Sequence, residues 1–126
     1  MDVIIAIATN GHVVSVTMCS KGRVQQAYTE LIVARNYVAL LTGLAEHIPR
    51  LLGNSHRLVA IGISAPENEP SNPRLFLGWT GVRLAEVLKN RHNVPVATVA
   101  NEGLVIDYDN VAAQNAAIDA ALALLR

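Results

Sequence analysis

The sequence is poor in cysteine and in aromatic residues. Of 126 residues, one is cysteine and 4% are aromatic. Cys19 alone cannot close an internal disulfide, and the chain has no set of His and Cys residues at the spacing of a metal site. We therefore expect a reducing, cytoplasmic setting and no bound metal. Hydrophobic residues still make up 52% of the chain, so Ala, Val, Leu and Ile must build the core.

The chain also lacks net charge and long apolar runs. Ten basic residues balance ten acidic ones, which leaves no electrostatic footprint for nucleic acid or an anionic membrane. No run of about 18 apolar residues is present, so we expect no membrane span. No basic region precedes the first apolar stretch, so we expect no signal peptide. The histidines at 47, 56 and 92 are expected to lie in solvent.

The chain alternates strand and helix patterns over its whole length. Residues 3–8 are almost all apolar, as in a strand buried on both faces. Turn signals separate them from strands expected at 12–18 and 23–30, and further strands are expected at 58–64 and 94–99. Apolar residues at helical spacing predict three helices, along the faces Leu41, Leu44, Ala45, Ile48 and Leu52; Val82, Ala85 and Leu88; and Ile118, Ala121, Leu122 and Leu125. The order β-β-β-α-β-α-β-α gives an antiparallel meander followed by parallel strands with right-handed crossovers.

Four short motifs resemble the first half of one family when taken in order. They are Gly22-Arg23-Val24, the strand end 61–66 (Ile-Gly-Ile-Ser-Ala-Pro), Leu77-Gly78-Trp79, and Val94-Pro95-Val96 followed by Asn101-Glu102. Their order and spacing resemble the ROK proteins (repressors, open reading frames and sugar kinases). The resemblance implies an α/β, ribonuclease H-like domain of the actin-like ATPase superfamily, with a mixed five-stranded sheet and helices on both faces. It also implies that residues 1–126 are one N-terminal kinase-like domain, part of a longer protein.

The sequence departs from the family where a kinase does its chemistry. The family has an Asp on the first strand for handling phosphate and metal, where this chain has Ile7, and residues 3–29 contain no Asp or Glu. Magnesium-assisted phosphoryl transfer needs hard oxygen ligands. The family's catalytic base, an Asp, is replaced by Glu102. Its extra methylene adds about 1.5 Å of reach, and misplacements of about 1 Å already impair catalysis. Leu104 replaces a family Asn, and nothing after it resembles the second domain of the kinases. We expect no enzyme activity, no cofactor and no metal.

The resemblance nominates three residues for contact with a carbohydrate. Asn101 and Glu102 stand at the sugar-facing position, where Glu102 is the vestige of the base. Glu67 follows Pro66, where the family has Gly, and brings a charge to the loop beside the sugar. Each residue also has an interpretation without a ligand. Asn101 and Glu102 can begin a helix, with the acid in its first turn, and Glu67 can lie in a solvated loop.

The resemblance favours a non-catalytic, carbohydrate-sensing domain of a NagC-like transcriptional regulator. DNA would then be bound only through a separate winged-helix domain. One alternative is the N-terminal half of a ROK sugar kinase, similar to glucokinases. Another is a structural or assembly domain without a ligand. The apolar stripe of the last helix also predicts a homodimer, because wide apolar stripes are normally buried.

Overall fold

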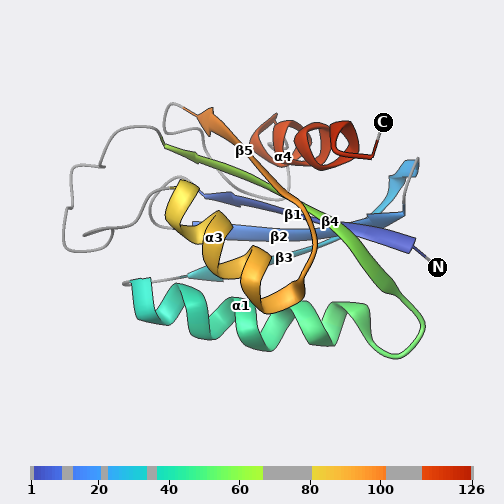
Figure 1. Cartoon of the computed structure of the whole chain (residues 1–126), viewed down its shortest axis with the longest axis horizontal. Helices are drawn as coiled ribbons and strands as arrows, with labels where there is room; N and C mark the ends of the chain where they lie inside the picture. Colours follow the sequence, from blue (N-terminus) through green and yellow to red (C-terminus); the bar gives the residue numbers. More distant parts are fainter. Residues whose placement is uncertain are drawn as a thin grey trace.

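A computed structural model (Figure 1) shows an α/β fold built around one sheet. The structure describes residues 2–9, 13–20, 23–33, 37–66, 81–101 and 112–125. Its elements are β1 (Asp2–Thr9), β2 (Val13–Ser20), β3 (Arg23–Val33), α1 (Tyr37–Leu52), β4 (Arg57–Pro66), α3 (Gly81–His92), β5 (Val96–Asn101) and α4 (Ala112–Ala123). Their order along the chain is the one that the sequence predicts.

The sheet has five strands in the order β3-β2-β1-β4-β5. β1 pairs antiparallel with β2, and β2 pairs antiparallel with β3. β1 pairs in parallel with β4, and β4 with β5, because a helix lies between the strands of each pair along the chain. The central strand β1 is buried from Val3 to Thr9. This explains its unbroken apolar run, since both of its faces carry helices.

Two helices, α1 and α3, cover one face of the sheet (Figure 1). α1 turns an apolar stripe inward at the helical spacing of three to four residues. This stripe is Leu40, Leu44, Ile48 and Leu51. α3 adds Leu84 and Leu88, both fully buried. The two helices pack on the odd-numbered β1 and β4 residues, among them Ile5, Ile7, Ile61 and Ile63. This face holds the larger of the two core clusters.

Helix α4 lies on the opposite face of the sheet and contacts β1, β4 and β5. Its inward residues Ala117, Ile118 and Ala121 pack on a row of small side chains that includes Ala6 and Ala60. Gly62 takes part in this contact with no side chain. A Cβ placed on Gly62 would lie 2.9 Å from the carbonyl carbon of Ala117 and 3.0 Å from the amide nitrogen of Ala121. The α4 backbone therefore rests directly on β4.

Two helices end with a residue in the left-handed conformation. α1 ends at Gly53 (φ 55°), whose N–H donates to the carbonyl of Pro49 at 2.9 Å. α3 ends at Asn93 (φ 55°), whose N–H donates to the carbonyl of Lys89 at 2.8 Å. Gly and Asn are the residues that tolerate this conformation best.

Some sequence expectations about burial are wrong. Ala45, expected on the inner stripe of α1, is exposed. The stripe runs through Leu40 and Leu51 instead, because the helix begins earlier than its clearest apolar spacing. His47, His56 and His92, all expected in solvent, are half-buried. Within the described ranges, no helix combines the length and apolar character needed to cross a bilayer.

Candidate functional site

The carboxyl ends of three parallel strands form the edge where the sequence places the candidate site. β1, β4 and β5 run in the same direction, so Thr9, Pro66 and Asn101 end at one edge of the sheet. In open α/β sheets, ligands bind in the crevice outside such strand ends. The last backbone pair of β4 and β5 joins Pro66 with Asn101. This places the main chain of one candidate residue, Asn101, at the edge.

The other two candidates follow directly in sequence. Glu67 comes after Pro66, and Glu102 comes after Asn101. Both lie outside the described residues, as does Leu104. The structure shows only that Pro66 and Asn101, the residues before Glu67 and Glu102, are paired through their backbones. The contact of any of the three side chains with a carbohydrate stays a prediction.

Ile7 occupies the strand position where the resemblance places a phosphate-site Asp. Its side chain is fully buried in the larger core cluster. Its backbone pairs with Val16 on β2 and Ile63 on β4, which are equally buried. A carboxylate among these side chains would lose its hydration without gaining a charged partner, which is strongly unfavourable. The fold therefore uses position 7 for packing.

Buried polar side chains mark the ends of β1, β2 and β4 near this edge. Thr9, Ser15 and Ser64 are each fully buried. Ala8 pairs with Ser15 on one side and Ser64 on the other, so the two serines belong to one row across the sheet. The Ser15 hydroxyl has no hydrogen-bond partner. Sequence reasoning did not single these serines out, although a Ser near the end of an otherwise apolar strand is a usable signal.

The described residues offer little for metal chemistry. No group of three or more His, Cys, Asp or Glu side chains converges anywhere in the described ranges. Cys19 is buried on the α4 face, and burial raises the pKa of its thiol. A thiol held in its neutral form is a poor nucleophile and a poor ligand. The structure gives Cys19 a packing role.

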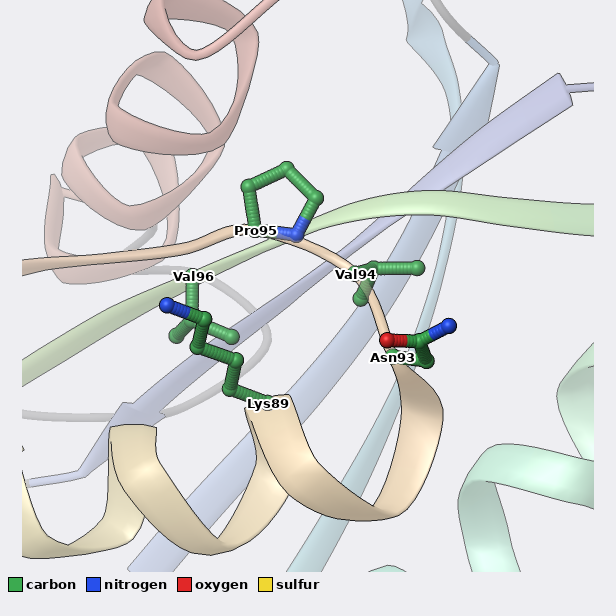
Figure 2. Close-up of a pocket in the computed structure, with 5 residues that line it drawn as sticks. All are labelled: Lys89, Asn93, Val94, Pro95 and Val96. Atoms are coloured by element: carbon green, nitrogen blue, oxygen red, sulfur yellow. The ribbon is translucent and has the colours of Figure 1, made fainter.

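At the amino ends of the parallel strands, away from the candidate site, a hollow lies between the end of α3 and the start of β5. It has a volume of about 370 Å³ and is lined by Lys89, Asn93, Val94, Pro95 and Val96. In Figure 2, Lys89 and Val96 lie at one side of it, and Asn93 and Val94 at the other.

His92 is the last residue of α3 and directly precedes Asn93, which lines this hollow. Burial, and then the charge of Arg91, lowers the pKa of its imidazole. Its Nε2 atom is buried without a hydrogen-bond partner. No sequence pattern pointed to this region as a site.

Two solved structures share this fold. YeaZ from Pseudomonas aeruginosa is 17% identical, with a TM-score of 0.51, and the match covers 80% of this chain and 44% of that one. The Lmo2764 protein from Listeria monocytogenes, proposed to be an N-acetylmannosamine kinase, is 19% identical, with a TM-score of 0.52, and covers 78% and 35%. No protein-family model matches the chain, and no curated protein does. At such identities the likeness shows the fold alone.

The chain therefore has a sugar-kinase-like fold. It spans less than half the length of either neighbour. The fold expected from the four motifs is supported by both neighbours, and membership of the ROK family is a proposal. The narrower assignment to NagC-like regulators is a proposal.

Proposed function

We propose that this chain is a non-catalytic, sugar-kinase-like domain that senses a carbohydrate for a ROK-type transcriptional regulator. The observation that supports this most is the burial of Ile7 in the core, at the position where a kinase of this fold would hold a phosphate-site carboxylate. A sensor needs the crevice at the strand ends but not the metal and phosphate chemistry. DNA contact would come from a separate winged-helix domain.

In this proposal, the β4 and β5 ends supply the sugar-facing groups. Asn101, paired through its backbone with Pro66, would contribute an amide that can both donate and accept hydrogen bonds. Glu102 and Glu67 would add carboxylate acceptors for sugar hydroxyls. For this chain by itself we expect weak binding, with a Kd of about 1 mM.

The test is a titration of the ¹⁵N-labelled chain, followed by amide chemical shifts. The probes are N-acetylglucosamine, N-acetylmannosamine, glucose, xylose and the 6-phosphates of the hexoses. We expect saturable shifts at Ser64, Ala65 and Asn101 for at least one probe, and their loss in Asn101→Ala. Asn93→Ala, at the opposite edge of the sheet, is the matched control and should bind normally. No saturable shift with any probe would favour the assembly-domain alternative.

A coupled ATPase assay with Mg²⁺ and the same sugars separates a sensor from a kinase half. We expect no turnover above background. Sugar-dependent ADP formation that is abolished by Glu102→Gln would overturn the proposal and favour the sugar-kinase alternative. A gel shift at about 150 mM salt should show no binding to duplex DNA, because the balanced charge offers no phosphate-binding surface.

A further inference from the structure

We propose that the outer edge of β5 binds an extended, acidic peptide segment of a partner protein by adding it as a sixth strand. The inference rests on three features of the described residues. These are a strand edge that no other described strand pairs with, a hollow at the amino end of β5, and a cation, Lys89, that lines this hollow. It concerns the strand edge at the amino end of β5 and stands independently of carbohydrate binding.

The first feature is the hydrogen-bonding pattern of β5. The N–H of Ile61 donates to the carbonyl of Pro95 at 3.0 Å, and Ile61 is in register with Val96. In a parallel ladder, alternate residues direct both backbone groups to the same neighbour. Residues 95, 97 and 99 therefore face β4, and the backbone groups of Val96, Thr98 and Ala100 face outward. In the described part of the chain, β5 pairs with β4 alone.

Within the described residues, this edge carries no charge, proline or bulge of the kind that normally protects one. In natural proteins, charged residues, an internal proline or a bulge in an edge strand discourage another strand from pairing with it. The strand reads Val-Ala-Thr-Val-Ala-Asn, without a charge or a proline. Its register with β4 is uninterrupted, so it has no bulge. Thr98 and Ala100 are also exposed. An extended segment could therefore pair here without meeting a charge or a kink.

The second and third features indicate the chemistry of that segment. Val94, Pro95 and Val96 line the hollow at the amino end of β5, which suits one apolar side chain (Figure 2). Lys89 lines it, and Arg91 lies on the same last turn of α3. Within the described ranges, neither cation forms an ion pair, and the preceding acid, Glu86, pairs with neither. Charge complementarity therefore favours an acidic residue next to the apolar one.

The direction of the added strand follows from these positions. Antiparallel pairs are slightly more stable per residue than parallel ones. An antiparallel segment places its C-terminal end beside the start of β5. The partner segment is thus a strand of alternating polar and apolar residues that ends in one apolar residue followed by one or two acidic residues. Backbone hydrogen bonds would provide affinity, and the hollow with its cations would provide specificity.

The probe is the fluorescein-labelled peptide Thr-Val-Ser-Val-Thr-Leu-Glu-Glu, followed by fluorescence anisotropy against the whole chain. We expect saturable binding that weakens about tenfold or more when Lys89 and Arg91 are both changed to Glu, because like charges then meet. A peptide ending in Leu-Lys-Lys is the matched control and should bind correspondingly weakly. Raising the salt from about 0.05 to 0.5 M should also weaken binding, through screening.

Thr98→Pro tests the strand addition itself. Its N–H faces outward, so proline removes a donor to the peptide without removing a bond to β4. We expect an unchanged circular dichroism spectrum and loss of peptide binding. Three outcomes would overturn the proposal: equal binding of the two peptides, full binding by a folded Thr98→Pro variant, or no binding at all. A dimer that Thr98→Pro abolishes would also overturn it, because a second copy would then be the natural occupant of the edge.

Discussion

Gly62→Ala tests whether the α4 backbone truly rests on β4. The new Cβ would lie 2.9 Å from the carbonyl carbon of Ala117 and 3.0 Å from the amide nitrogen of Ala121, and closer still to the Ala117 carbonyl oxygen. All three atoms belong to the main chain of a helix, so no side-chain rotation can relieve the contact. The helix must move away from the sheet as a unit. Ile118 and Ala121, now buried, would lose packing as it moves.

The expected cost follows from that geometry. Overpacking a core typically destabilises a protein by about 1–3 kcal/mol, and a clash between two backbones belongs at the upper end. A loss of about 3 kcal/mol is a large part of the roughly 5–15 kcal/mol that separates a folded domain from its unfolded state. With a urea dependence of about 2 kcal/mol per molar, the unfolding midpoint should fall by about 1.5 M.

Urea unfolding followed by far-ultraviolet circular dichroism measures this change. Ala100→Val is the control, because it adds atoms to an exposed position of the neighbouring strand and should change stability by less than about 0.5 kcal/mol. The double variant Gly62→Ala/Ala117→Gly should not recover stability, since the contact is with main-chain atoms. A loss below about 1 kcal/mol for Gly62→Ala, or recovery in the double variant, would refute the direct backbone contact.

Four further predictions concern other parts of the fold. Leu44→Ala, at a fully buried position of α1, should cost about 2–5 kcal/mol in urea unfolding, whereas Leu124→Ala, at a position 39% exposed, should cost far less. Gly53→Ala should lower the unfolding free energy by about 1–2 kcal/mol, because Gly53 has a left-handed φ of 55°. An unchanged urea midpoint would contradict this backbone conformation at the end of α1. The pKa of His92 is lowered in the folded chain, so the neutral imidazole contributes stability above the ordinary histidine pKa, and this contribution is lost as the pH falls through the lowered pKa. His92→Gln should therefore reduce the dependence of the unfolding free energy on pH between about pH 7 and 5. An unchanged pH dependence in this variant would show that His92 is not its source. If α4 mediates a dimer, as its sequence suggests, sedimentation of the whole chain at micromolar concentration should show a dimer that Leu125→Lys weakens. A monomer would mean that the apolar stripe of α4 is buried within its own domain, where Leu125 is already partly buried.

Most of the fold could be predicted because it rests on short-range patterns. The unbroken apolar run of β1 reflects helices on both of its faces, and the spacing of Leu44 and Ile48 reflects one inward stripe of α1. Gly53 and Asn93 are strong stop signals because few residues tolerate their conformation. Each of these features is determined by residues that are close together in the chain, so it can be predicted from one sequence.

The features that escaped prediction depend on where elements meet. The role of Gly62 appears only when α4 is placed against β4, some 55 residues later in the chain. The burial of His56 and His92 depends on how two helix ends lie against the sheet. The outward pattern of Val96, Thr98 and Ala100 depends on one hydrogen bond between strands. At the candidate site, sequence predicts the strand edge, but Glu67 and Glu102 lie outside the described residues.

The position of α4 has a consequence for how the chain matures on the ribosome. β1 and β2 are synthesised first, yet the cover of their Ile4, Ala6 and Cys19 face is complete only when Ala123 has emerged. At about 5–20 residues per second, roughly 5–20 s separate the synthesis of Cys19 from that of its cover. During this interval the thiol and the adjoining apolar strands are open to oxidants, chaperones and other nascent chains. The last helix therefore ends the vulnerable period of the first strand.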